Sequence, residues 1–421
     1  MKKLLLILLF QGILFAQAQV TLDDCHEKAK ANFPLIKQYD LINQTTEYTL
    51  SNANKAYLPQ VKLNVIGGYI IQGIPAMTVP GQPADDPSKT QLIGIAQVNQ
   101  VLWDGGATRT AKDIAKAAAD AEKAGTDVSV YSIRERVNQV YFGILLIEEQ
   151  LKQLAILEEN LNRNLDRVQL SKDNGLAYQS DVDEVKAELL NLEQKRIEFR
   201  YARLGYIKVL SLLTGEAYSE NSEFVKPVVV NEMLPSENKR PELDLYASQL
   251  RLNDIQSAMN KVALMPKVGL MGAGIFITPG ISFGTSKIEN LAIVGLSASW
   301  KIDALYKNSN NKNLDKIKAE KIANQQETFL FTNNLQLSQT SSEIEKQKAI
   351  IEHDNEIVRL KTNVTKSYQT RFDNGMCTMN DLINSMNREN EARSNQALHN
   401  VQLLMSKYNY QYISGNKNNI Q

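Results

Sequence analysis

The placement of proline constrains this chain more than any other feature of its sequence. All eleven prolines lie within residues 34–87, 227–241 and 266–279, and none occurs over residues 88–226 or 280–421. A proline inside a helix removes a backbone hydrogen bond and clashes with the preceding turn. The two proline-free runs can therefore hold helices far longer than those of ordinary globular domains.

The first run predicts a long coiled-coil hairpin. Residues 107–172 predict one helix of roughly 66 residues, about 100 Å long. In its second part, from Val130 on, apolar residues recur at alternating spacings of three and four, broken only at Glu158. This spacing is typical of a left-handed coiled coil. A turn at Asn174-Gly175 follows, and a second helix over 180–213, with Ser180 or Asp181 as its N-cap, must return antiparallel. The predicted seam residues are Val130, Ile133, Val137, Val140, Ile144, Ile147, Leu151, Leu154, Leu161, Leu165 and Val168.

The second half of the chain repeats the first at an offset of about 200 residues. Asp173-Asn174-Gly175 aligns with Asp373-Asn374-Gly375, Asp181 with Asp381, and Gly215 with Gly415. Matches in this order indicate a tandem internal duplication. We expect a first repeat over 19–215, a linker over 216–240, a second repeat over 241–415 and a tail over 416–421. The helices of the second hairpin are predicted over 305–372 and 380–413.

Each repeat also predicts one β-hairpin, over 60–103 and 267–302, after a short helix of its own. In the first strand, Val61, Leu63 and Val65 alternate with polar Lys62 and Asn64, and a loop with four prolines at 75–87 follows. Four strands cannot close a barrel, and an open sheet edge is not tolerated in lipid. We therefore expect three copies of the chain to complete a barrel of twelve strands, continued by a barrel of helices. The predicted fold class is mainly α with a β-barrel part.

The first residues predict export. Lys2 and Lys3 precede an apolar run over 4–15, and Ala16-Gln17-Ala18 is a small-x-small cleavage pattern. The run is too short to span a membrane, so residues 1–18 read as a signal peptide whose removal leaves Gln19 first. A buried N-terminal helix is the alternative. No later segment has eighteen consecutive apolar residues, so no transmembrane helix is expected.

Composition argues against nucleic-acid binding and catalysis. Lysine plus arginine and aspartate plus glutamate both number 47, which leaves no basic surplus for nucleic acid. Cys25 and Cys377 are too few for a disulfide framework and are expected as free thiols. His26, His353 and His399 are scattered and predicted to be solvated, so neither a metal site nor a cofactor is expected. No nucleophile elbow or phosphate-binding loop is present, and an enzyme is not predicted.

Five segments, in order along the chain, resemble the TolC family of outer-membrane factors. They are Thr21-Leu22-Asp23-Asp24-Cys25, Tyr57-Leu58-Pro59-Gln60-Val61, Leu102-Trp103-Asp104-Gly105-Gly106, the two Asn-Gly turns and Arg240-Pro241-Glu242-Leu243. The resemblance implies a homotrimeric α/β barrel, embedded in outer-membrane lipid and continued by a helical barrel in the periplasm. It also implies a passive channel that serves a periplasmic adaptor and an inner-membrane pump, in efflux or type I secretion. It does not identify the transported substrate.

The resemblance further assigns two sets of residues to function. The resemblance implies that the two interhelical turns contact the adaptor. Their residues are Gly175, Leu176, Ala177, Gly375, Met376 and Cys377. The pore gate falls to Asp181, Glu184, Asp381 and Asn384, just beyond these turns.

Both assignments have simpler alternatives. The turn residues can serve only to end helices, and an aspartate at a helix start can serve only as a cap. The sequence also departs from the family pattern, because Asn384 stands where an acid is expected and Cys377 where relatives can carry an arginine.

A periplasmic coiled-coil adaptor, or membrane fusion protein, is the alternative function. Such a protein would show one helical hairpin between two halves of a small β domain, with a membrane anchor. This chain has two hairpin sets, each preceded by its own pair of strands, so the sequence favours the channel.

Overall fold

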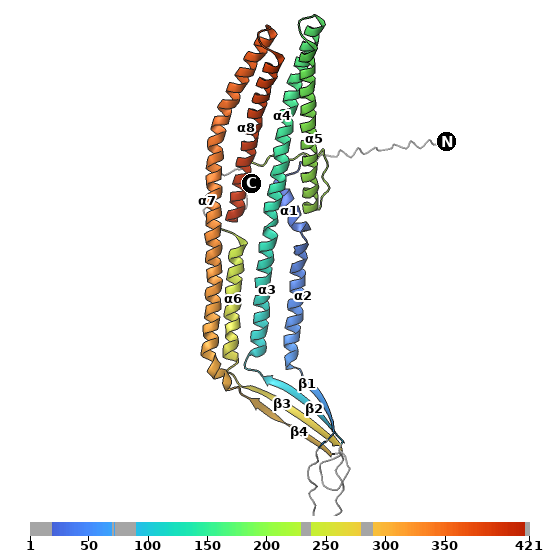
Figure 1. Ribbon diagram of the computed structural model, residues 1–421. Helices are drawn as coiled ribbons and strands as arrows, with labels where there is room; N and C mark the ends of the chain where they lie inside the picture. Colours follow the sequence, from blue (N-terminus) through green and yellow to red (C-terminus); the bar gives the residue numbers. More distant parts are fainter. Residues whose placement is uncertain (1–18, 70, 72–89, 229–236, 279–288, 417–421) are drawn as a thin grey trace, which may run out of the picture. The chain divides into compact units, whose positions relative to one another are not determined.

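The computed structural model describes residues 19–69, 71, 90–228, 237–278 and 289–416 (Figure 1). The predicted signal peptide over 1–18 and the proline-rich loop at 75–87 lie outside these residues. Contacts group the chain into two units: residues 1–37, 126–243 and 327–421 form the first, and residues 38–125 and 244–326 form the second. Helices α3 (Ala107–Tyr131) and α7 (Asp303–Asp373) contribute residues to both.

The first unit consists of two helical hairpins and a short N-terminal helix. Helix α4 (Ile133–Asp173) turns into α5 (Gln179–Thr214), and the last part of α7 turns into α8 (Met379–Ser414). The partners of each hairpin lie side by side (Figure 1). Helix α4 packs against α5, α8 and α1 (Leu22–Asn32), so it is the central element of this unit.

The predicted heptad seam is the core of the first unit. It is buried along its length except at Leu151 and Leu165, which are half-buried. Leu161 and Val168 of α4 join Val182 and Val185 of α5 in one apolar cluster, to which the start of α8 also contributes. The 3.5-residue period predicted this packing because it keeps apolar side chains on one face along the whole helix.

A backbone clamp holds the N-terminal segment on this core. Val20 forms a parallel bridge with Phe224, its N–H donates to Glu223 O at 2.9 Å, and its carbonyl accepts from Val225 N at 2.9 Å. The buried hydroxyl of Tyr141 lies 2.7 Å from the same carbonyl. The clamp therefore ties the start of the described chain to the segment that follows α5.

The second unit contains a single antiparallel sheet. Its strands are β1 (Gln60–Tyr69), β2 (Thr90–Trp103), β3 (Lys267–Thr278) and β4 (Glu289–Ser299), in that order. The two predicted hairpins are β1–β2 and β3–β4, and β2 pairs with β3 to join them.

The remaining helical elements of the described chain are two helices and two short 3-10 turns. They are α2 (Lys37–Asn54), α6 (Pro241–Val262) and the turns at Pro34–Ile36 and Lys55–Tyr57.

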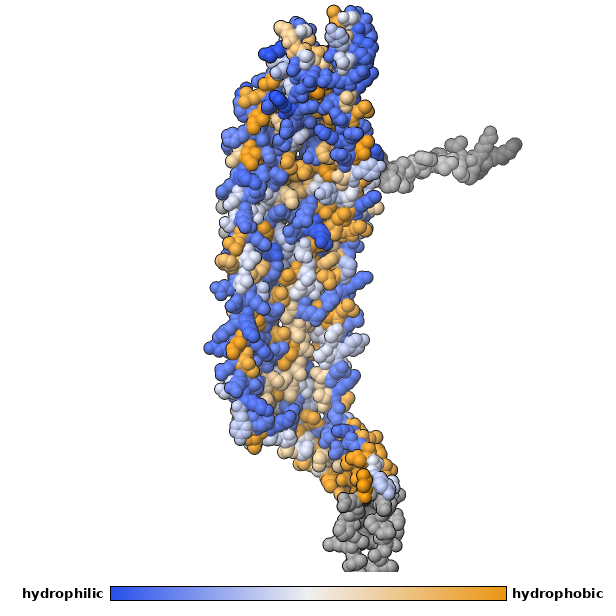
Figure 2. Space-filling model, viewed as in Figure 1, coloured by the Kyte–Doolittle hydropathy of each residue, from blue (hydrophilic) through white to orange (hydrophobic). Residues whose placement is uncertain are grey.

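The strand register assigns each residue to one of the two faces of the sheet. Residues directly opposite each other share a face, so Val61, Val98, Gly272 and Val294 lie in one row. The neighbouring row on the other face holds Lys62, Gln97, Ala273 and Ile293. Apolar side chains gather over the strands in the view of Figure 2.

The predicted single helix over 107–172 is wrong in one respect. It is two helices, α3 and α4, separated at Ser132. The hydroxyl of Ser132 donates to Ser129 O at 2.7 Å, and such a side-chain bond competes with the helical backbone for its carbonyl. The backbone of Ser132 stays in the right-handed helical region, at φ −61° and ψ −21°.

The prediction of solvated histidines is wrong for two of the three. His26 is buried, with Nε2 2.7 Å from Asn138 Oδ1, and His399 places Nδ1 2.7 Å from Oδ2 of the buried Asp354. Both histidines lie on helices that pack against others in the first unit, and their partners are on those other helices. Their positions in the sequence do not show which side of each helix is covered. His353 is exposed as predicted.

Mainly helical structure with one small four-stranded sheet confirms the predicted fold class. The division into two consecutive repeats stays a prediction, because contacts group segments of both halves in each unit. Of the helices in the described ranges, none combines the length and the apolar character that crossing a membrane requires.

Truncating the seam should loosen the first unit. Leu161→Ala removes a fully buried side chain and should lower the free energy of local opening by about 3 kcal/mol, through lost burial and a residual cavity. Native-state hydrogen exchange of the α4 and α5 amides in the full chain measures this. Leu170→Ala, at a largely exposed position on the same helix, is the control, and equal effects of the two variants would contradict the assignment of the seam.

Candidate functional site

The turn between α4 and α5 is closed by its own backbone. Gly175 has φ +75°, a left-handed conformation that glycine adopts without strain. Its N–H donates to Lys172 O, and Leu176 N–H donates to Ser171 O, both at 2.8 Å. The side-chain amide of Asn174 donates to Leu170 O, also at 2.8 Å. These bonds satisfy carbonyls that the end of α4 would otherwise leave free.

The turn between α7 and α8 repeats this geometry. Gly375 has φ +69°, and its N–H donates to Phe372 O at 2.9 Å. Met376 N–H donates to Arg371 O at 2.8 Å, and the Asn374 amide donates to Thr370 O at 2.7 Å. We refer to residues 174–178 and 374–378 as the two tips.

Each tip exposes an apolar side chain directly after its glycine, and the first tip also exposes Tyr178. Leu176 is 83% exposed and Met376 is 67% exposed, although both are apolar. Ala177 and Cys377, one residue further, are half-buried. The Cys377 thiol donates to Tyr368 O at 3.5 Å, and burial raises the pKa of this thiol. Of the six predicted adaptor-contact residues, Leu176 and Met376 therefore offer the most apolar surface.

The aspartates predicted for the gate also serve the starts of the helices. Tyr178, not Ser180 or Asp181, is the N-cap of α5, so that prediction is wrong. Asp181 lies three residues into the cap motif, and its carboxylate accepts the Tyr178 N–H at 2.9 Å. An acid at the third residue of a helix can reach back to the backbone N–H of the N-cap residue. Asp181 therefore stabilises the start of α5 without being its N-cap.

Asp381 makes a complete capping box at the start of α8. Its Oδ2 accepts the Thr378 N–H at 3.0 Å and the Thr378 hydroxyl at 2.7 Å. Thr378 Oγ1 in turn accepts the Asp381 N–H at 3.1 Å. The side-chain and backbone hydrogen bonds from Thr378 lower the pKa of Asp381, because they favour the ionised form.

The other two predicted gate residues follow one helical turn later. Glu184 is half-buried on α5, and Asn384 on α8 is exposed, with its amide donating to Asn380 Oδ1 at 2.8 Å. The two helix starts therefore differ in charge although their backbone geometry matches.

Two polar links between the hairpins were not predicted. Arg167 of α4 forms an ion pair with Asp373 of α7 at 3.2 Å, close to both tips. Asn387 of α8 donates to Glu188 of α5 at 2.8 Å. The partners lie about 200 positions apart, which the offset of the duplication could have suggested, but only packing brings them together.

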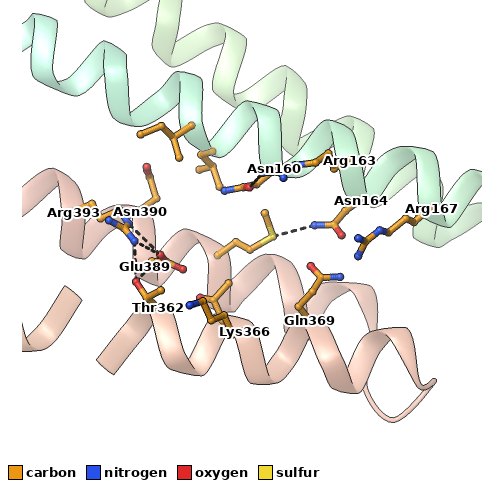
Figure 3. A pocket seen from close by; sticks show the side chains of 14 residues that line it. Asn160, Arg163, Asn164, Arg167, Thr362, Lys366, Gln369, Glu389, Asn390 and Arg393 are labelled. Carbon is orange, nitrogen blue, oxygen red and sulfur yellow. Dashed lines mark hydrogen bonds and ion pairs between the residues drawn. The ribbon is translucent and has the colours of Figure 1, made fainter. Parts of the chain in front are cut away.

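A polar cavity of about 460 Å³ lies between α4, α7 and α8, and it too was not predicted (Figure 3). Four cationic residues and one carboxylate line it, together with amides, hydroxyls and a small apolar surface. The lining residues are Ile156, Leu157, Asn160, Arg163, Asn164, Arg167, Thr362, Thr365, Lys366, Gln369, Met386, Glu389, Asn390 and Arg393.

Residues that could bind a metal do not gather in the part of the chain that the structure describes: no group of three or more histidine, cysteine, aspartate or glutamate side chains has a suitable arrangement there.

Residues 26–216 match a protein family described as "Outer membrane efflux protein". A sequence search of curated proteins gave no significant match.

Solved structures share the fold over nearly the whole chain. The outer-membrane channel OprN is 15% identical, with a TM-score of 0.68, over 94% of this chain and 90% of that chain. The Campylobacter jejuni CmeC outer membrane channel is 14% identical, with a TM-score of 0.64, over 95% and 87%. The outer membrane protein VceC from Vibrio cholerae is 13% identical, with a TM-score of 0.65, over 94% and 96%.

The capping box should make the start of α8 sensitive to pH. The lowered pKa of Asp381 means that its ionised form stabilises the folded state above the ordinary aspartate pKa, and that this contribution is lost as the pH falls through the lowered value. Thr378→Val removes the hydroxyl, so the pKa should rise and the first turn of α8 should lose protection at a higher pH. Hydrogen exchange of residues 379–383 across pH measures this.

The first turn of α5, whose capping acid Asp181 is untouched, serves as the internal control. A shift of the same size in both turns would contradict the role of Thr378.

Proposed function

We propose that this chain is a TolC-type outer-membrane efflux protein and forms one subunit of a trimeric channel. The family match over residues 26–216 and the shared fold support this proposal. The channel passively conducts substrates that an inner-membrane pump delivers through a periplasmic adaptor. Residues 1–18 are removed on export, and the strands are inserted in the outer membrane.

The open sheet carries this proposal. Within the described residues, β1 pairs only with β2 and β4 pairs only with β3, so both edges lack a further strand. Val294 is 86% exposed on one face, and Val61 and Leu63 are also exposed there. An apolar face suits contact with lipid, but open edges in lipid are very costly. Copies of the same sheet, joined edge to edge, would satisfy both edges and close a barrel.

The long helices support the same arrangement. Leu190, Ile197 and Tyr201 lie on α5 at spacings of seven and four and are exposed. Phe331 and Leu335 are exposed at a spacing of four on the part of α7 that belongs to the first unit. Apolar rows of this kind, with helical spacing, fit packing against helices of a neighbouring subunit.

The two tips are proposed to contact the adaptor. Leu176 and Met376 each stand beside a glycine without a side chain, so a partner helix can approach the backbone closely there. Gly175, Ala177, Gly375 and Cys377 shape the same turns and form the rest of the proposed contact surface.

The gate is proposed at the starts of α5 and α8. In a trimer, Asp181 and Asp381 would each form a ring of three carboxylates, with Glu184 and Asn384 one turn further on. In their ionised form, the three Asp381 carboxylates would attract cations and repel anions. Capping and gating are compatible, because a carboxylate that accepts an N–H retains its negative charge.

Conductance of the purified protein tests the channel. In a planar lipid bilayer it should form trimeric, cation-preferring pores, and Asp381→Asn should lower the cation-over-anion permeability ratio by about twofold or more, because a ring of charge is lost. Glu159→Gln, at a strongly exposed carboxylate on α4, is the matched control. A monomer that fractionates with soluble periplasmic proteins and forms no pores would refute the proposal.

Photo-cross-linking in intact cells tests the tips. A photoreactive amino acid in place of Leu176 or Met376 should capture a periplasmic adaptor, identified by mass spectrometry, because both side chains are exposed at the tips. The same amino acid in place of Leu212, exposed near the opposite end of α5, is the control. Capture at Leu212 but not at the tips would place the contact elsewhere.

A further inference from the structure

The cavity between α4, α7 and α8 includes none of the residues proposed for the tips or the gate. It lies within the first unit, and Figure 3 shows its polar side chains reaching into it from all three helices. Its volume of about 460 Å³ falls in the range of small-molecule sites, whereas docking a helix would need a long open groove.

The lining of the cavity holds four cations and one carboxylate. Its single carboxylate, Glu389, is 2.7 Å from Arg393, and both groups also bond to Thr362. This pair is neutral overall, which leaves Arg163, Arg167 and Lys366.

These three cations are neutralised to different extents. Arg167 pairs with Asp373, which lies outside the lining, and Arg163 donates to Asn160 at 2.5 Å and lies 3.8 Å from Glu159 on its own helix. Among the described residues, Lys366 makes no ion pair and no side-chain hydrogen bond, and only its backbone carbonyl accepts a bond, from the Thr370 hydroxyl.

The oxygen of a buried amide in the cavity wall has no hydrogen-bond partner. Asn164 is only 3% exposed, and its Nδ2 lies 3.4 Å from the sulfur of Met386 (Figure 3). Its Oδ1 has no hydrogen-bond partner. A buried polar atom of this kind is costly unless a bound molecule or water completes it.

An apolar surface lies beside these polar groups. Leu157 and Met386 line the cavity and are themselves buried, with Ile156 at the more exposed side. A ligand here would therefore meet both apolar contacts and cations.

We propose that this cavity binds a small amphiphilic organic anion. The acidic head group, a carboxylate, sulfonate or phosphate, would bind Arg163, Arg167 and Lys366, and the apolar part would rest on Leu157 and Met386. A hydrogen-bond donor near the head group would bond the free Oδ1 of Asn164. The inference does not depend on the channel function, because it uses only contacts within one chain.

Chemical protection of Lys366 tests the proposal. The full-length protein, held in amphipol, is acetylated with a sulfo-N-hydroxysuccinimide ester, and modification of Lys366 is followed by mass spectrometry. Three probes share one apolar tail: octanesulfonate, octyltrimethylammonium and octyl glucoside, each below its micelle-forming concentration. Octanesulfonate should slow modification of Lys366 saturably and should not slow that of Lys348, which is exposed on the same helix outside the cavity. The cationic and neutral probes should give no protection.

Variants identify the contacts. Arg163→Gln should weaken protection of Lys366 by about tenfold in probe concentration, the change expected for one lost charge-assisted contact. Lys366→Gln should weaken octanesulfonate binding similarly when binding is measured by calorimetry. Arg388→Gln, an exposed arginine of α8 outside the cavity, should leave both measurements unchanged.

Three results would overturn the proposal. Equal protection by all three probes would mean binding of any apolar tail, and no protection by octanesulfonate would mean that the cavity takes no such anion. Protection of Lys366 only when a partner protein is cross-linked at the tips would mean that a protein surface, not a small molecule, covers the cavity.

Discussion

The buried seam of α4 is the interaction on which the first unit depends. Because its apolar side chains recur at 3.5 residues, one face of the helix can contact α5, α8 and α1 along its length. The clamp at Val20, the two tips and the links between the hairpins all lie on elements that this seam holds together. A change in the period would move these elements apart even if every residue of the tips were retained.

The sheet differs from the helical unit, because the described chain leaves hydrogen-bonding groups unpaired at its two edge strands, β1 and β4. Its strands satisfy one another internally, yet both edges stay open in the described chain. The unpaired backbone groups of the two edge strands therefore favour pairing with strands of another copy of the chain. Contact between apolar surfaces alone would not select these edges. This is why the oligomer in the proposed function rests on the sheet edges, with the exposed rows of α5 and α7 as additional surface.

At the tips, one set of side chains serves two demands. Gly175 and Gly375 allow the chain to reverse, and Asp181 and Asp381 close the next helices at their first turns. Chain reversal and capping leave Leu176 and Met376 exposed, and they leave the aspartates negatively charged. Capping thus explains why the aspartates stand where they do, and it leaves their charge and the exposed apolar side chains available for the proposed contact and gate.

The sequence by itself determined the long helices, the two hairpins, the seam and the repeated turns, because each depends on local spacing and on where proline and glycine stand. It did not determine the break at Ser132, the burial of His26 or the position of Tyr178 as the N-cap that Asp181 bonds, which depend on individual hydrogen bonds. The joining of two hairpins into one sheet, the Arg167–Asp373 pair and the cationic cavity were decided only by tertiary structure. Their residues lie far apart in the chain, and only the packing of helices and strands brings them within bonding distance.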